Sequence, residues 1–171
     1  MNLIRQIGRP QPRQYAVYFS CLVLIGVSLS FLYHHVHQEQ VLFHHGQKAL
    51  AADEYSRAAA FFAQARQTGL QTPRFLQQMA QVHMRLGHWD QAKDAYRHLL
   101  AQQPEDMHIK LELVRILFIQ GQLDKALDKV QHILQHKPDW SLARYLQGKI
   151  YAAQGNFEQA IQAYKVILGE T

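Results

Sequence analysis

The sequence predicts an all-α protein in which one N-terminal transmembrane helix is followed by an α-solenoid of four helix-turn-helix repeats. Two observations lead to this prediction: residues 15–33 form an uncharged apolar run, and turn-forming glycines recur every 34 residues in the rest of the chain. Hydrophobic residues make up 48% of the 171 residues and charged residues 18%, which is ordinary for a folded chain. The chain therefore has enough apolar residues to form a core.

The apolar run from Tyr15 to Tyr33 is long enough to cross a bilayer. Its 19 residues, as a helix, rise roughly 28 Å, close to the thickness of the hydrocarbon layer. Tyr15, Tyr18 and Tyr33 stand where interfacial aromatic residues belong. A soluble core helix would show a polar face, which the run lacks. A cleaved signal peptide would have a shorter apolar segment followed by a cleavage site of small residues. We therefore expect residues 15–37 to form a transmembrane helix with a His-rich collar.

The basic residues that flank the run predict its orientation. Arg5, Arg9 and Arg13 precede it, whereas Lys48 is the one Lys or Arg in the twenty residues that follow. Because the flank richer in Lys and Arg stays in the cytoplasm, we expect a cytoplasmic N-terminus. The expected location is the bacterial inner membrane, crossed by a single pass, with the repeats in the periplasm. The predicted divisions are a basic cytoplasmic arm, the anchor with its collar, and the repeat domain, at residues 1–14, 15–37 and 38–171.

Charge and cysteine content narrow the classes of partner. From His34 onward, 15 Lys and Arg residues face 13 Asp and Glu residues, so little of the net charge of +5 lies in the repeats. No dense basic stripe with interleaved aromatic residues remains, and we expect no nucleic acid partner. The only cysteine, Cys21, lies in the apolar run, so a single chain can form neither a disulfide nor a thiolate zinc site. Gly26 and Ser30 give one small-xxx-small spacing, through which a homodimer could form.

A 34-residue period organises the chain after the apolar run. Gly87, Gly121 and Gly155 mark this period, and Asp53 takes the glycine position one period earlier. Large and small residues recur in register with the glycines, in the columns Trp89, Leu123 and Phe157; Ala92, Ala126 and Ala160; Tyr96, Val130 and Tyr164. Each period contains two apolar stripes at helical spacing around its turn glycine, which predicts a pair of short amphipathic helices. The four predicted repeats lie at about 39–72, 73–106, 107–140 and 141–171.

These columns resemble the tetratricopeptide repeat. The second unit keeps the family pattern of large, small, turn and aromatic positions as Leu76, Ala80, Gly87, Trp89, Ala92, Tyr96 and Pro104. The first unit keeps Gly46 but has Asp53 at the turn and Leu70 where proline is usual, and terminal repeats are often atypical. The resemblance covers nearly all of the chain after the apolar run, and it implies a protein-binding scaffold without catalytic activity.

The resemblance also implies a concave groove lined by the first helix of each repeat. The side chains expected there are Phe43, Gln47, Arg74, Gln77, Gln81, Arg85, His108, Leu111, Arg115, Phe118, Tyr145 and Lys149. Cations outnumber acidic residues in this set, so the expected ligand is an acidic or C-terminal peptide. A solvated face without a ligand is the alternative. The groove has no asparagine, so the carboxylate clamp known in the family is not carried over.

The last helix carries a second candidate surface. Its apolar residues Ile161, Tyr164 and Leu168 have no predicted helix after them. Because exposed apolar surface usually marks an interface, we expect another chain or a second copy of this one to dock there.

Histidines near the membrane suggest a weaker alternative. His34, His35 and His37 could hold a metal ion, but no acidic residue or cysteine accompanies them at suitable spacing. A polar collar at the membrane interface is the favoured explanation, and we expect no metal and no cofactor. His132 and His136 form an i,i+4 pair on a helix that we expect to be exposed.

The sequence therefore predicts a noncatalytic scaffold or assembly factor for an envelope complex, such as a secretion, pilus, exopolysaccharide or cytochrome-maturation system. It has no Gly-rich phosphate loop, nucleophile elbow or His-Glu-x-x-His helix. The expected partners are membrane-embedded or membrane-adjacent proteins, together with the bilayer around residues 15–33. Two alternatives stay open: a metal- or haem-handling membrane protein that uses the collar, and an organelle-surface import receptor with its repeats in the cytosol.

Overall fold

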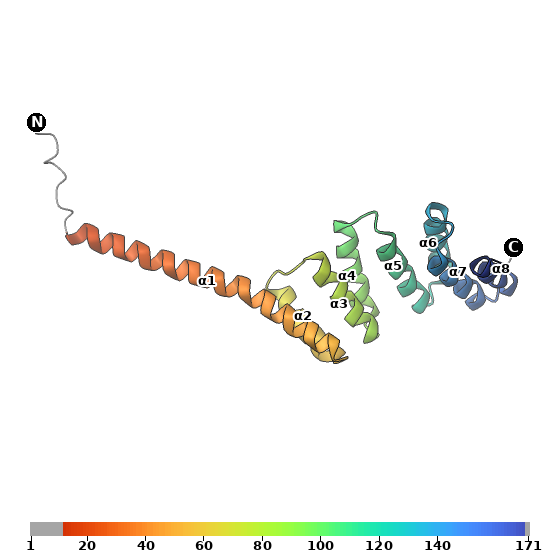
Figure 1. Cartoon of the computed structure of the whole chain (residues 1–171), viewed down its shortest axis with the longest axis horizontal. Coiled ribbons are helices and arrows are strands. Elements are labelled where there is room, and N and C mark those ends of the chain that lie inside the picture. The colour runs from red at the N-terminus through yellow and green to blue at the C-terminus, as the bar shows by residue number, and fades with distance from the viewer. Residues whose placement is uncertain (1–11, 170–171) are drawn as a thin grey trace, which may run out of the picture.

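The computed structural model describes the backbone of residues 12–169 and the side chains of residues 16–33 and 38–169. The described backbone forms eight helices and no strands. The helices are α1 (Pro12–Ala51), α2 (Tyr55–Gln67), α3 (Pro73–Arg85), α4 (Trp89–Gln102), α5 (Met107–Ile119), α6 (Leu123–His136), α7 (Ser141–Ala153) and α8 (Phe157–Leu168). Figure 1 shows α1 as a long rod that leads into a stack of helical hairpins. The all-α solenoid is confirmed, and most of the predicted basic arm lies outside the described residues.

Helix α1 is one continuous element of 40 residues. Pro12 suits its first position, where no backbone N–H is needed for a helical hydrogen bond. The boundary predicted between residues 37 and 38 falls inside the helix, so the apolar run and the first helix of the first hairpin are not separate elements. The most apolar window of the segment Ala16–Ala51 has a mean hydropathy of 2.0, and none of it is buried by the rest of the chain. By length and composition, α1 is therefore a candidate membrane span.

Each hairpin turns at a residue with a left-handed backbone. Gly87, Gly121 and Gly155 have φ values of +70°, +74° and +79°. Asp53 has φ +57° and is the only non-glycine residue with a positive φ in the part of the chain that the structure describes. Aspartate tolerates this conformation better than most residues do. The first unit is therefore a hairpin like the others, although it lacks the turn glycine.

The two helices of a hairpin cross where a small residue faces a larger one. A Cβ atom placed on Gly46 would lie 2.2 Å from Cε1 of Phe62, and one on Gly148 would lie 2.4 Å from Cε1 of Tyr164. One and two repeats after Gly46 and Phe62, the same columns hold Ala80 with Tyr96 and Val114 with Val130. In the first, second and fourth hairpins a small residue opposite a large aromatic one allows close crossing without a void, whereas in the third two valines share the space.

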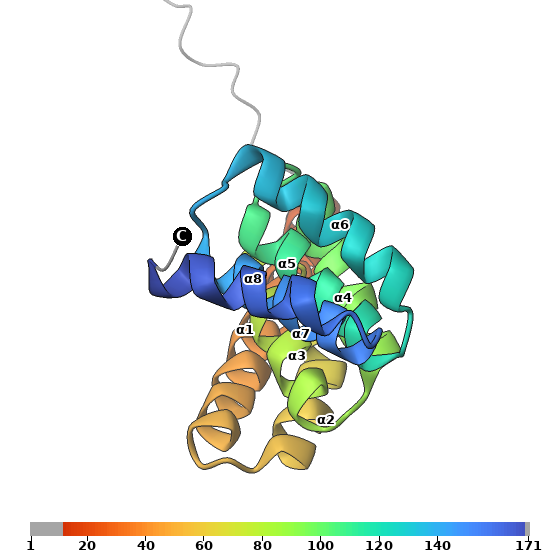
Figure 2. The same cartoon turned by 90° about the vertical axis from the view of Figure 1, so that its right-hand side faces the viewer.

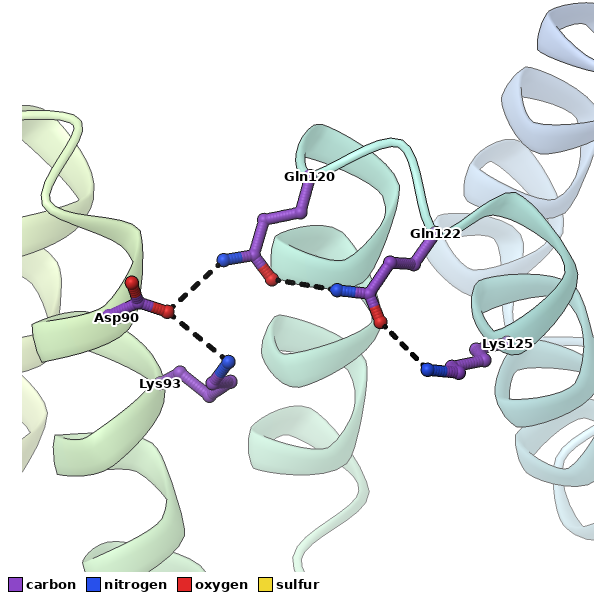
Figure 3. A network of polar contacts seen from close by, with 5 residues as sticks. All are labelled: Asp90, Lys93, Gln120, Gln122 and Lys125. Carbon is purple, nitrogen blue, oxygen red and sulfur yellow. Dashed lines mark hydrogen bonds and ion pairs between the residues drawn. The ribbon is translucent and has the colours of Figure 1, made fainter.

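Neighbouring hairpins are joined near their turns by a repeated hydrogen bond. Gln120 Nε2 donates to Asp90 Oδ1 at 3.3 Å, as Figure 3 shows with its neighbouring contacts. One repeat later, Gln154 Nε2 donates to Asp124 Oδ1 at 2.8 Å. Leu86 occupies the equivalent position one repeat earlier and has no side-chain donor. The second and later hairpins are thus linked by a contact that the first pair lacks.

The apolar core forms two clusters that meet at α5. Ile109 and Ile116 of α5 belong to the first cluster, whereas Leu111 and Val114 belong to the second. Viewed along the stack, successive hairpins are rotated relative to one another, as in a solenoid (Figure 2). Helix α5 therefore lies in the middle of the solenoid and contributes residues to both core clusters.

Candidate protein-binding groove

The inner face of the solenoid contains a hollow of about 880 Å³ bordered by α1, α3, α4 and α5. Predicted groove residues from α3 and α5 lie on its walls, namely Gln77, Gln81, Arg85, His108 and Arg115. They come together because positions three and four apart on a helix share one face. Trp89, Tyr96 and Leu99 add apolar surface that the first-helix pattern did not predict.

A smaller hollow of about 210 Å³ adjoins the first one. It lies between α5 and α7, and Arg115 and Ile119 line both hollows. The Nζ atom of Lys149 lies 5.3 Å from the ring centroid of Phe118 and 5.8 Å from that of Tyr145. We call the two hollows together the groove.

Not every predicted residue contributes a side chain to the groove. Phe43 instead packs its half-buried ring in the core, and Gln47 donates from Nε2 to Oε1 of Gln78 at 3.0 Å. Arg74 is exposed but lines neither hollow. Leu111 is only 1% exposed and forms part of the floor of the smaller hollow. Phe43, Gln47 and Arg74 therefore do not line the groove, because Phe43 and Gln47 pack against neighbouring side chains and Arg74 lies outside both hollows.

The larger hollow is less basic than the sequence predicted. Arg85 and Arg115 share its walls with the carboxylates of Asp53, Asp106 and Glu112. Arg115 Nη1 donates to both carboxylate oxygens of Glu112, at 2.9 and 3.1 Å. The prediction counted outward-facing first-helix side chains, whereas Asp53 lies in a turn and Asp106 caps α5. The turn and N-cap positions were readable from the sequence and could have revealed these two carboxylates.

The basic and aromatic character is kept at the smaller hollow. Arg115 and Lys149 are its charged lining residues, and they stand beside Phe118 and Tyr145. No carboxylate belongs to the described residues that line it. An anionic group would therefore find its most favourable position at this end of the groove.

Tyr96 of α4 is one of the residues that line the larger hollow. Tyr96 is buried, and burial raises the pKa of its phenol well above the usual value, with a further increase from the charge of Glu112. The side chain therefore remains protonated at physiological pH.

The apolar surface predicted on the last helix is only partly exposed. Ile161 and Leu168 are 52% and 71% exposed, whereas Tyr164 turns inward against Gly148 and is half-buried. Phe157 of the same helix is exposed as well, and the sequence prediction omitted it. Docking of a partner on α8 stays a prediction.

His34, His35 and His37, the ligands of the weaker metal-binding alternative, lie in α1, but their side chains are outside the described residues. Elsewhere, the ring centroids of His132 and His136 are 4.7 Å apart. Among the described side chains, no group of three or more His, Cys, Asp or Glu residues could hold a metal ion. The collar alternative therefore stays untested.

An array of helical hairpins with an open inner groove defines a solenoid-type binding protein. A tetratricopeptide repeat family model matches residues 78–139 and 130–171, and a model of YpiA-like, C-terminal tetratricopeptide repeats matches residues 40–106. The chain therefore belongs to the tetratricopeptide repeat family. The search of curated protein sequences found no match.

Solved structures with the same fold come from several bacterial proteins. YrrB, described as a TPR protein with an unusual peptide-binding site, is 18% identical, with a TM-score of 0.69 over 92% of this chain and 84% of YrrB. A MamA structure from Desulfovibrio magneticus is 19% identical, with a TM-score of 0.66 over 78% of this chain and 75% of that one. TTC0263 from Thermus thermophilus is 23% identical, with a TM-score of 0.58 over 77% of this chain and 73% of TTC0263. At these identities the likeness concerns the fold.

Proposed function

We propose that this chain is a noncatalytic, membrane-anchored scaffold that holds an extended segment of a partner protein in the groove. The observation that carries this proposal is the hollow of about 880 Å³ on the inner face, continued by the smaller hollow next to it. Family membership supports it, since tetratricopeptide proteins are generally noncatalytic scaffolds. The peptide-binding site in the description of YrrB agrees with this use of the fold.

The charge pattern of the groove indicates how the partner segment lies. Lys149 and Arg115 favour an acidic side chain or a terminal carboxylate at the α7 end. Gln77 and Gln81 line the other hollow, where their amides can pair with the donors and acceptors of an extended backbone. The proposed partner is thus a segment with an acidic group at one end and a mixed polar and apolar remainder.

The proposed location follows from α1. Its apolar segment is a candidate membrane span, and the arginines before it favour a cytoplasmic N-terminus. Since the same helix continues into the first hairpin, the repeats would lie next to the bilayer in the periplasm of a bacterial inner membrane. We infer a membrane-embedded or membrane-adjacent partner in an envelope assembly such as a secretion, pilus, exopolysaccharide or cytochrome-maturation system.

The groove can be tested by crosslinking and pull-down of the full chain from native membranes. The double variant Arg115→Glu with Lys149→Glu should reduce recovery of the main partner roughly tenfold or more, because two favourable charge contacts become repulsive. Arg74→Glu is the matched control, since it reverses a similar charge on α3 outside both hollows. Unchanged recovery with the double variant would show that the partner binds elsewhere.

The orientation is tested separately by proteolysis. In intact cells the repeats should be protected, and in spheroplasts they should be digested. Protection in spheroplasts would overturn the periplasmic location without affecting the groove.

A further inference from the structure

A third hollow, of about 390 Å³, lies on the outer side of the solenoid, with α4 and α6 as its walls and α5 as its floor. We call it the outer furrow, and its lining residues are Lys93, Arg97, Leu100, Lys110, Leu113, Val114, Leu117, Lys129, His132 and Ile133. Leu113 and Leu117 lie about 180° around α5 from Arg115, because each residue turns a helix by about 100°. The outer furrow is therefore separate from the groove.

The floor of the outer furrow is aliphatic. Val114 and Ile133 are buried at its base, and Leu100, Leu113 and Leu117 are half-buried around them. All the other lining residues are basic or histidine, and none of the lining residues is a carboxylate. This composition differs from that of the larger inner hollow, where three carboxylates lie among the cations.

The cations of the outer furrow are arranged to meet an anion at its rim. The side chains of Lys93 and Lys110 are only 26% and 25% exposed, so their methylene stems cover apolar surface while their ammonium groups reach water. Their ion-pair partners are the highly exposed carboxylates of Asp90, at 3.3 Å, and Glu105, at 3.4 Å. Such surface pairs are weak and can be exchanged for a ligand. No carboxylate among the described side chains pairs with Arg97.

We infer that the outer furrow binds a long-chain fatty acid, with the acyl chain along the aliphatic floor and the carboxylate at the Lys and Arg rim. Lysine and arginine side chains donate hydrogen bonds but accept none, the aliphatic side chains do neither, and His132 is the one lining residue whose side chain can accept a hydrogen bond. An extended peptide would leave its own N–H groups without acceptors over this floor, whereas an acyl chain has no such groups. A volume of about 390 Å³ falls within the range of small-ligand sites, about 300–1,000 Å³.

The test uses the full chain in phosphatidylcholine nanodiscs and a palmitic acid analogue with a mid-chain diazirine. After illumination, crosslinks mapped by mass spectrometry should fall on the α5 segment that contains Leu113 and Leu117. Excess palmitate should abolish this labelling, and palmityl alcohol should not, because it lacks the anion. Among shorter saturated acids, competition should strengthen by about fourfold per methylene until the furrow is filled.

Two kinds of variant complete the test. Arg97→Gln combined with Lys110→Gln should lower labelling of α5 about tenfold or more, since charge-assisted hydrogen bonds are lost. Lys125→Gln on α6, outside the furrow, is the matched control. Leu117→Trp should block labelling because the larger side chain fills the outer furrow. Circular dichroism must show unchanged helicity for each variant.

Three results would overturn the inference. These are labelling confined to α1, equal competition by palmitate and palmityl alcohol, and displacement of the probe by an acidic peptide at lower concentration than by palmitate. The last of these would identify the outer furrow as a protein-binding surface. None of these results depends on the groove, so the two proposals can fail independently.

Discussion

The first and last hairpins share one contact but differ in what surrounds it. In each, a glycine of the first helix lies against an aromatic ring of the second, as Gly46 does with Phe62 and Gly148 with Tyr164. Phe62 is fully buried, whereas Tyr164 is half-buried near exposed residues of α8. The same sequence pattern thus sets the helix crossing in both hairpins. The residues around each aromatic ring decide how far that ring can move away from the glycine.

The surroundings of the two rings explain the difference. The Phe62 ring is held by Phe43 and Phe75, with ring centroids 5.9 and 5.8 Å away. Tyr164 has one aromatic neighbour, Tyr145, at 5.9 Å, and its other side approaches solvent. We therefore expect the contact of Gly46 with Phe62 to be rigid, and we expect the Tyr164 ring to be able to move away from Gly148.

The largest expected effect is that of Gly46→Ala. The added methyl would lie 2.2 Å from a ring carbon that cannot move away, and overpacking of this kind costs about 3 kcal/mol of unfolding free energy. Urea unfolding of the full chain in detergent, followed by circular dichroism, measures it. Adding Phe62→Leu should recover part of the loss. A loss below about 1 kcal/mol would show that the first contact is not rigid.

Gly148→Ala should cost less, about 1 kcal/mol, although the geometric overlap is similar at 2.4 Å. The Tyr164 ring is half-buried and can turn toward solvent to make room. The same unfolding experiment checks this value. Equal losses of unfolding free energy for the two alanine variants would contradict the comparison, because the residues around the two aromatic rings would then have no effect.

The smallest expected effect is the pH dependence that Tyr164 gives to the last hairpin. Burial, and then the nearby Tyr145, raise the pKa of Tyr164 above the ordinary tyrosine value of 10.0, because the folded state disfavours the phenolate. Its contribution to stability is therefore complete below pH 10.0 and is lost as pH rises through the folded-state pKa. Tyr164→Phe should remove this part of the alkaline destabilisation. Circular dichroism and tyrosinate absorbance above pH 10.0 test this prediction. If Tyr164→Phe leaves the pH profile of unfolding unchanged, Tyr164 is not a source of the alkaline destabilisation.

Most of the fold could be predicted from the sequence because the same residue pattern, with the same structural role, recurs in each repeat. The turn position was visible at Gly87, Gly121 and Gly155, and the same column located Asp53, which has the left-handed conformation without being glycine. The continuity of α1 also agrees with the sequence. Nothing in the sequence marks a break between the apolar run and the first hairpin, and the structure has none.

The groove was predicted only in part, because a column pattern describes one repeat and a binding surface forms between repeats. Phe43 falls in a groove column, yet it packs in an aromatic cluster with Phe62 of the same hairpin and Phe75 of the next one. The pairing of Glu112 with Arg115 changes the charge of the groove but follows no column. The outer furrow was missed for the same reason, since Lys93, Lys110 and Lys129 come from three helices and occupy unrelated repeat positions.

The continuity of α1 has a mechanical consequence. A helix without a joint between Ala16 and Ala51 transmits torque from one end to the other, because no loop is present to absorb a change of angle. The apolar half would then act as a lever arm for the hairpin stack. A partner that tilts or twists this half would reorient the mouth of the groove, even though it touches none of the repeats.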